Sequence, residues 1–552
     1  MNSRPVVDYG AVAHDASVQL LADYDDRCAR YSEPRARTEL LGSLSNASEQ
    51  DRLGCAQRLV LRGRVETATE VLSAAHRQYP DSTAIAFALA GMYVQSRRAV
   101  EAESLLRNSL KRQPDNAAAA MLLARLHKDR GRIRAAAQTL RDWFKYGKPA
   151  TESVIQALEM LDGCGCKTDA AAIAETEIAA GNQDVRIHAY AATYAIQLGQ
   201  FDLARQRFLF VHAHSHQALE WHVPYGLSSA QRYSTRNHAD FALFRECLRR
   251  GDMSKKARAT LLFALGKAHD DIGEFGDAVK FFREANELAR SLSPWSRKRW
   301  RRMIDARMHA PLLASRSADS AAWTPVFILG VPRSGTTLIA ELLSRHPRIC
   351  NRGELSHIWS LAQRMPPVGQ PDRALLDALA IEYEMQVLQD DAHDARWFID
   401  KQPLNLLHVD LILTLWPHAK IIHCQRSARD TALSLWTQYF LEDTHAYAYD
   451  FADIAAVVQG SNRLMTRWKE LYPSSIYAIR YEELIANPEL RTSELCVWLG
   501  LSPLDFTDSS PRAQVINTAS FWQARQTVYA RSVQRWRSYA EHLPELLQFS
   551  TR

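Results

Sequence analysis

Alanine recurs in the first half of the chain at a fixed spacing of 34 residues, and this repeat constrains the fold more than any other feature. The repeated positions are Ala68, Ala102, Ala136, Ala170 and Ala204. Five residues before each of them lies a glycine or, once, an arginine. Antiparallel helices that pack closely need small side chains where they cross, and glycine suits the turn between them. One such pair cannot bury its own apolar face, so the units are expected to stack into a solenoid.

The period and the placement of small residues resemble the tetratricopeptide repeat (TPR). We expect this all-α solenoid over residues 48–310; a generic helical array is the alternative. Ala278 lies 74 residues beyond Ala204, so the region 213–245, rich in histidine, tyrosine and serine, is expected to hold a degenerate repeat with an insertion. The concave surface of such a solenoid is expected to bind a peptide or protein, or to form an interface between subunits.

A second type of structure begins with the apolar run 326–329, which predicts a buried strand. Gly330 and Gly335 follow in a turn, and Thr336 and Thr337 begin a segment with helical periodicity. A strand, a turn and a helix N-terminus together offer backbone N–H groups and partial positive charge to a phosphate. The two glycines have the spacing of the nucleoside-triphosphate P-loop, but Thr336 stands where that loop has lysine. The pattern therefore favours another anionic group; an ordinary strand–helix turn is the alternative.

The segment Pro332-Arg-Ser-Gly-Thr-Thr337 after a strand resembles the 5′-phosphosulfate loop of sulfotransferases, which use 3′-phosphoadenosine 5′-phosphosulfate (PAPS). The resemblance covers about 324–540 and rests on four motifs in the family's order. It is closest in kind to the tyrosylprotein sulfotransferases and to bacterial sulfotransferases that carry TPR repeats. It implies a P-loop-type α/β domain with a parallel sheet after the solenoid. The expected parts are an unclear, partly helical segment 1–47, the repeats 48–310, a linker 311–323 and the sulfotransferase domain 324–552.

The resemblance also implies roles for single residues. Glu354 matches a Gly-Glu segment that supplies the catalytic base, because an acceptor hydroxyl must lose its proton as it attacks sulfur; His357 is the alternative base. Lys401 follows the expected strand 397–400 and matches the lysine that stabilises charge on the leaving phosphate. The residues expected to hold the sulfonate and the 5′-phosphate are Arg333, Ser334, Gly335, Thr336 and Thr337, with Arg333 also counted as catalytic.

Arg426 and Ser434 match the arginine and serine that bind the nucleotide 3′-phosphate in the family. A dianionic phosphate favours an arginine fork and a hydroxyl donor at a helix start. The family's aspartate after this arginine is replaced by Ser427, and Arg429 is a second candidate; we prefer Arg426. Tyr481, in an Arg-Tyr-Glu segment, is expected near the adenine. Further nucleotide-binding candidates, in a stretch that closes over the nucleotide in relatives, are Thr518, Ser520, Arg525 and Arg535.

The sequence thus predicts an enzyme that transfers the sulfonate of PAPS to an acceptor hydroxyl and releases adenosine 3′,5′-bisphosphate. No metal is expected, since arginine and lysine supply the charge that magnesium supplies in kinases. The acceptor is expected to be a peptide or protein, including a peptidyl tyrosine bound with help from the repeats, or a small hydroxyl-bearing molecule. Two alternatives stay open: a kinase with a degenerate P-loop, and a non-catalytic TPR scaffold with a nucleotide-binding domain.

Composition narrows the remaining classes of partner and location. The net charge of +6, from 68 basic and 62 acidic residues, does not indicate a nucleic-acid partner. The eight scattered cysteines predict neither a disulfide framework nor a zinc site, which favours a reducing, cytoplasmic location. No apolar stretch reaches the roughly 18 residues of a membrane span, and the N-terminus leads into Asp8 and Asp15 without an apolar core, so neither a membrane span nor a signal peptide is expected.

Overall fold

The computed structural model describes residues 33–147, 149–316, 322–366, 369–392, 394–440, 443–504 and 532–549. The chain divides into two compact units, 1–169 and 170–552. The division falls within helix α10, Lys167–Ala179.

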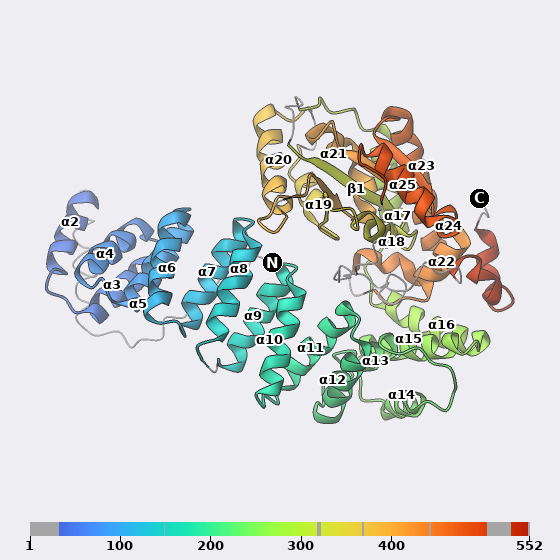
Figure 1. The fold of residues 1–552 in the computed structure, drawn as a ribbon, viewed down its shortest axis with the longest axis horizontal. Coiled ribbons are helices and arrows are strands. Elements are labelled where there is room, and N and C mark those ends of the chain that lie inside the picture. Colours follow the sequence, from blue (N-terminus) through green and yellow to red (C-terminus); the bar gives the residue numbers. More distant parts are fainter. Residues whose placement is uncertain are drawn as a thin grey trace. The chain divides into compact units, whose positions relative to one another are not determined.

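The first unit is built from paired helices (Figure 1). Their bounds are α2 Glu33–Ser43, α3 Glu49–Leu61, α4 Val65–Gln78, α5 Thr83–Gln95, α6 Ala99–Arg112, α7 Ala117–Asp129, α8 Ile133–Phe144 and α9 Thr151–Gly163. The repeated alanines Ala68, Ala102 and Ala136 are fully buried. The 34-residue period also appears in the helix caps, because Ser48, Ser82 and Asn116 each accept a hydrogen bond of 3.0–3.2 Å from the backbone N–H three residues later.

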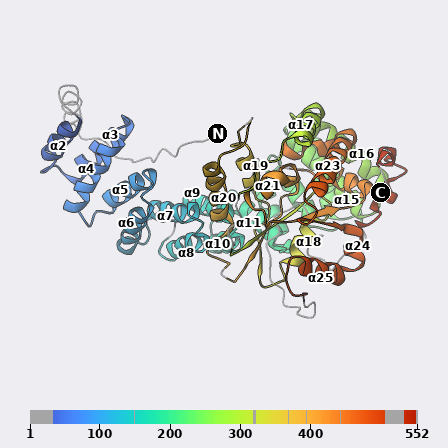
Figure 2. The same cartoon turned by 90° about the horizontal axis from the view of Figure 1, so that it is seen from above.

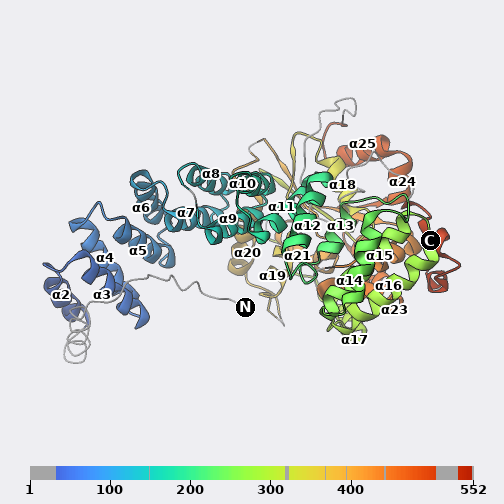
Figure 3. The same cartoon turned by 90° about the horizontal axis from the view of Figure 1, so that it is seen from below.

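The second unit begins with further helices of the repeat region (Figure 3). They are α11 Val185–Leu198, α12 Phe201–His214, α13 Val223–Ser229, α14 Ala239–Arg250, α15 Lys255–Asp271, α16 Phe275–Ser291 and α17 Arg297–His309. The short helix α13 lies in the region where the sequence indicates an insertion.

An α/β domain follows in the same unit, and its strands form one parallel sheet in the order β2-β3-β1-β4-β5 among the described residues. The strands are β1 Thr324–Gly330, β2 Ile349–Asn351, β3 Trp397–Asp400, β4 Lys420–Gln425 and β5 Ile476–Arg480. The residues of β1 after Thr324 are all buried, as expected for a central parallel strand with both faces covered. The predicted order of a helical repeat region and a parallel-sheet α/β domain is confirmed.

Helices cover both faces of this sheet. Figure 2 shows α18, α24 and α25 on one side, and α21 and α23 on the other. The helices are α18 Thr336–Leu343, α19 His357–Ala362, α20 Arg373–Val387, α21 Val409–Leu415, α22 Ala428–Trp436, α23 Phe451–Leu471, α24 Tyr481–Ala486 and α25 Pro488–Trp498. Short 3-10 helices are η1 Pro403–His408, η2 Asp443–Tyr449, η4 Arg535–Tyr539 and η5 Pro544–Gln548.

The last repeat helices share a hydrophobic core with the α/β domain. The rings of Phe282 in α16 and Trp436 in α22 lie 5.9 Å apart between centroids. The side-chain amide of Asn286 donates to the carbonyl of Trp436 at 2.9 Å, and the indole of Trp300 in α17 donates to the carbonyl of Ala456 in α23 at 3.1 Å. Helices α16 and α17 are therefore part of the wall that supports the α/β domain.

Two further expectations from the sequence concern the linker between the domains and membrane-spanning helices. The linker expected at 311–323 includes residues 317–321, which lie outside the described ranges, and the domain boundaries stay predictions. In the part of the chain that the structure describes, no helix combines the length and apolar character that crossing a bilayer requires.

Candidate active site

All five strands end at the same edge of the sheet, and a predicted site residue follows each end within three positions. The loop after β1 carries Arg333, β2 leads to Glu354, β3 to Lys401, β4 to Arg426 and β5 to Tyr481. Ligands of open α/β sheets bind at the carboxyl ends of the strands. The candidate active site therefore lies at this edge.

The loop between β1 and α18 runs between two glycines that have no room for a side chain. A Cβ atom on Gly330 would lie 2.5 Å from the carbonyl oxygen of Cys424, and one on Gly335 would lie 2.5 Å from Cδ2 of Tyr481. Gly335 also has a φ of +100°, in the left-handed region. Thr336 and Thr337 begin α18 directly after it. The predicted strand, turn and helix N-terminus are present, with backbone packed tightly against β4 and against Tyr481 at the start of α24, Tyr481–Ala486.

Arg333 lies at the centre of this loop in a strained backbone conformation. Its φ is +74°, which is uncommon for a residue with a side chain and is typical of functional sites. Its Nε donates to Oγ of Ser434 in α22 at 3.0 Å. Burial and the neighbouring Arg426 lower the pKa of Arg333 to about 10, so the guanidinium is still charged at neutral pH.

Arg426 contacts the loop, Tyr481 at the start of α24 and the C-terminal residues. One terminal nitrogen donates to the carbonyl of Arg333 at 2.9 Å, and the other donates to the carbonyl of Ser532 at 2.6 Å. Its guanidinium lies 4.7 Å from the ring centroid of Tyr481, whose hydroxyl is 2.6 Å from Oγ of Ser532. The structure thus brings Arg333, Arg426, Ser434 and Tyr481 together.

Arg429, the second candidate for the 3′-phosphate, has a different environment. Its Nε donates to the carbonyl of Phe549 at 3.0 Å, and its guanidinium covers the ring of Trp536 at 4.4 Å. These contacts direct Arg429 toward the C-terminal residues, which favours Arg426 for the nucleotide.

Glu354 and Lys401 form an ion pair between Oε1 and Nζ. Lys401 is buried with 3% of its surface exposed, while the Glu354 side chain is 34% exposed. The backbone N–H of Lys401 donates to the carbonyl of Gly353 at 2.8 Å, which ties the end of β3 to the loop that carries Glu354. Burial lowers the pKa of Lys401, and the charge of Glu354 opposes that change. A carboxylate that reaches solvent therefore stands beside a buried ammonium group.

His357, the alternative base, lies at the start of α19. Its ring centroid is 6.5 Å from that of Tyr383 in α20, and burial lowers its pKa. The ring packs toward α20, whereas Glu354 contacts Lys401. This arrangement favours Glu354 over His357 as the group nearest the reacting atoms.

A pocket of about 110 Å³ opens at the ends of β4 and β5, beside the loop. Four buried polar atoms that border it have no hydrogen-bond partner among the described residues. They are Ser334 Oγ, His423 Nδ1, Arg426 Nε and Thr431 Oγ1. Buried polar groups normally have partners, so these atoms indicate a polar ligand or water in the pocket. Donors beside such a loop suit an anionic group such as a phosphate.

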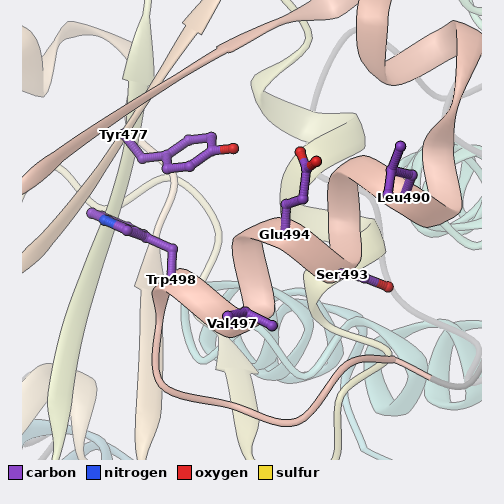
Figure 4. Close-up of a pocket in the computed structure, with 6 residues that line it drawn as sticks. All are labelled: Tyr477, Leu490, Ser493, Glu494, Val497 and Trp498. Atoms are coloured by element: carbon purple, nitrogen blue, oxygen red, sulfur yellow. The ribbon is translucent and has the colours of Figure 1, made fainter.

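A larger surface pocket, of about 500 Å³, lies on α25 and β5 (Figure 4). Tyr477 and Trp498 stand at one end of it and Leu490 at the other. None of its lining residues is among the predicted site residues.

The C-terminal candidates divide between described and undescribed residues. Thr518, Ser520 and Arg525 lie outside the described residues. Arg535 is described: its guanidinium donates to Oδ2 of Asp270 in α15 at 2.6 Å. Burial lowers the pKa of Arg426, and the charge of Arg535 lowers it further, so Arg535 lies in the same charged neighbourhood without bonding to the loop.

Sequence reasoning missed two residues of this neighbourhood. Ser532 bonds to both Arg426 and Tyr481. Tyr225, in α13 of the repeat region, accepts a hydrogen bond from the side chain of Gln438, and the charge of Arg333 acts on its hydroxyl. No local pattern marks either residue, because both reach the site from distant parts of the chain.

One group of possible metal ligands occurs among the described residues, at His269, Glu274 and Asp277. Arg236 already forms ion pairs with Glu274 and Asp277, at 2.9 Å for the latter. The group lies in α15, in the turn after it and in the first turn of α16, and it includes no predicted site residue.

The effect of burial on the Asp400 carboxyl, at the end of β3, can be tested through the pH dependence of stability. Burial raises its pKa to about 7, although the Tyr383 hydroxyl donates to it at 3.0 Å. A carboxyl group whose pKa is higher in the folded than in the unfolded state makes the protein less stable as the pH rises. The loss develops between the unfolded pKa, about 4, and the folded pKa. We therefore expect Asp400→Asn to have a higher melting temperature than wild type at pH 8, with a smaller difference at pH 5, measured by circular dichroism. A difference that does not change with pH would contradict this assignment.

Comparison with known proteins is consistent with this geometry. Residues 325–505 match the family model described as "Sulfotransferase family", and residues 93–150 match "Tetratricopeptide repeat". An uncharacterized protein of Aquifex aeolicus is 29% identical over 316 residues, which cover 53% of this chain and 41% of that protein. Protein-tyrosine sulfotransferase 2 of Gallus gallus is 26% identical over 194 residues, which cover 32% of this chain and 51% of that protein. The chain thus spans about half the length of the curated relatives it matches.

Among solved structures, the sulfotransferase domain from the Synechococcus PCC 7002 olefin synthase aligns with 21% identity and a TM-score of 0.31, over 41% of this chain and 91% of that chain. The similarity to a family rests on the matched models and on the sequence relatives. The chain is similar to the sulfotransferase family over residues 325–505 and to tetratricopeptide repeats over residues 93–150.

Proposed function

We propose that this protein transfers the sulfonate group of PAPS to an acceptor hydroxyl. The observation that carries the proposal is the arrangement at the carboxyl edge of the sheet. There, the Glu354–Lys401 ion pair follows β2 and β3, and the anion-binding loop follows the neighbouring strand β1. A base, a buried cation and a phosphate cradle are the groups that such a transfer needs.

The nucleotide is assigned to the loop and to the ends of β4 and β5. The loop N–H groups, Arg333 and the start of α18 hold the 5′ end. Arg426 and Ser434 hold the 3′-phosphate, and Tyr481 lies beside the adenine. The free Nε of Arg426 and the hydroxyl of Ser334 support this assignment, since both are buried donors without a partner among the described residues. When bound, PAPS supplies an activated sulfonate on a phosphate leaving group.

Glu354 acts as the base in this proposal. Its carboxylate reaches solvent, where an acceptor enters, and accepts the proton of the attacking hydroxyl. Lys401 stays buried behind it and offsets the negative charge that builds on the leaving phosphate. Because Arg333 and Lys401 supply this positive charge, we expect transfer to continue in the presence of a metal chelator.

The relatives suggest which acceptor to test first. Several of them are protein-tyrosine sulfotransferases, so a peptidyl tyrosine is the first acceptor to test. The repeats are proposed to bind the protein that carries it. Small phenols and sugars make up the rest of the acceptor panel, since a fold does not determine a substrate.

Calorimetric titration with adenosine 3′,5′-bisphosphate in the absence of metal tests the nucleotide class. We expect the wild type to bind, and Arg426→Ala to bind about tenfold to a hundredfold more weakly, because the variant loses charge-assisted hydrogen bonds to the 3′-phosphate. The matched control is Arg348→Ala. That arginine lies before β2, at the opposite edge of the sheet, where it covers Trp397 at 5.1 Å, and we expect wild-type affinity.

The same titration with ATP and magnesium separates the alternatives. Failure of the wild type to bind the bisphosphate contradicts the sulfotransferase proposal. ATP binding in that case would favour a kinase, and binding of neither ligand would favour a scaffold.

A further inference from the structure

The described C-terminal residues, 532–549, form a strap that bonds to the nucleotide-binding residues at one end and to the repeat helices along its length. At the first end, Ser532 accepts a hydrogen bond from Arg426 through its carbonyl and pairs with the Tyr481 hydroxyl through Oγ, both at 2.6 Å. Ser532 is 7% exposed. One residue of the strap thus contacts both side chains assigned to the nucleotide.

Two aspartates hold the strap in place. Asp430 in α22 accepts the backbone N–H groups of Gln534 at 2.8 Å and Trp536 at 3.0 Å. Asp270 in the repeat helix α15 accepts from the Arg535 guanidinium at 2.6 Å and from the Tyr539 hydroxyl. Each carboxylate therefore bonds to η4 or to a residue next to it.

Packing between the strap and the repeat helices surrounds the second anchor. The ring of Tyr539 is fully buried and lies 4.9 Å from that of Phe275 in α16. Arg283 in α16 forms an ion pair with Glu545 at 2.9 Å. The strap is thus docked on α15 and α16 as well as on the α/β domain.

The strap also accepts one of the two hydrogen bonds that hold the terminal nitrogens of Arg426. These nitrogens donate to Arg333 and Ser532, and the Nε of Arg426 stays without a partner among the described residues, at the pocket that Ser334 and Thr431 also border. A side chain already held in its binding orientation loses less entropy when the ligand binds. Loosening the strap therefore lowers affinity.

We propose that Asp270, a residue of the repeat region, is a positioning residue for nucleotide binding, acting through Arg535 and the strap on Arg426. This inference rests on the proposed function. It makes the last repeat helices part of the nucleotide site and gives Arg535 an anchoring role. A change in the repeats that moves α15 then changes nucleotide affinity.

Asp270→Asn in the full-length protein tests this role with two measurements. We expect the backbone amides of 532–549 to exchange hydrogen faster without ligand, and adenosine 3′,5′-bisphosphate to bind about threefold to tenfold more weakly. Arg535→Gln should have the same effect, and the double variant should bind no more weakly than either single one, because both changes break the same contact. The matched control is Asp277→Asn in α16, whose carboxylate pairs with Arg236 and Lys280 and does not contact the strap; it should behave as wild type.

Faster exchange with unchanged affinity would overturn the coupling, and unchanged exchange would overturn the anchoring. Additive losses in the double variant would show that Asp270 does not act through Arg535. If the wild type itself does not bind the bisphosphate, the proposed function fails and the inference fails with it. If the wild type binds and Asp270→Asn binds equally well, only the inference fails.

Discussion

Replacing Lys401 by methionine is expected to slow sulfonate transfer by about a hundredfold to a thousandfold, the usual effect of removing one group that stabilises charge in a transition state. The change removes a buried ammonium group and keeps a side chain of similar length. It leaves Glu354 without its partner, but that side chain is 34% exposed and stays hydrated, so the fold should persist. The rate is measured as transfer of radiolabelled sulfonate from PAPS to a tyrosine-containing peptide.

The affinity for adenosine 3′,5′-bisphosphate separates the two ways in which Lys401 could act. A group that acts mainly in the transition state changes the rate and leaves binding of the product nucleotide close to wild type. The matched control is Lys420→Met, at the opposite end of β4, where the ammonium lies 4.9 Å from the Trp498 ring. A rate equal to wild type in Lys401→Met, or a loss of affinity as large as the loss of rate, would contradict the assigned role.

Gly335→Ala is expected to weaken binding of the bisphosphate on the order of a hundredfold. The new Cβ would lie 2.5 Å from Cδ2 of Tyr481, and the residue would keep a φ of +100° that side chains rarely adopt. Such strain costs on the order of 1–3 kcal/mol. Relief requires the loop N–H groups or Tyr481 to move, and both are assigned to the nucleotide. Calorimetry measures the affinity, and circular dichroism measures the melting temperature of the same sample.

Gly500→Ala is the matched control for this variant. Gly500 has a φ of +80°, but a Cβ there would meet no heavy atom within 4 Å. We therefore expect a lower melting temperature from backbone strain alone, with wild-type affinity for the bisphosphate. Equal affinity in Gly335→Ala and wild type would mean that the loop is not the anion-binding site.

Sequence patterns within short stretches were enough to predict the repeat helices, β1 and the loop that follows it. The alanines spaced 34 residues apart predicted the paired helices, and all five of them are fully buried in the structure. The run 326–329 predicted β1, and the two glycines predicted the turn after it, since their backbone conformation and close contacts exclude a Cβ. Each of these inferences depends on neighbours within one repeat or one turn of chain.

The contacts that complete the site could not be predicted in this way. Lys401 and Glu354 are 47 residues apart, and Arg535 and Asp270 are 265 residues apart. The pairing of such residues depends on the order of the strands and on how the last repeat helices pack against α22 and α23. A single sequence contains no spacing that records either arrangement.

By itself, the sequence determined the repeats, the strand–loop–helix unit and the identity of the charged groups, because these follow from periodicity and backbone sterics within short stretches. The tertiary structure alone decided the order of the five described strands, that Lys401 is buried against Glu354, and that a repeat helix anchors the strap that bonds to Arg426. These features depend on the packing of segments far apart in the chain, where burial and charge pairing are settled only once the whole unit has folded.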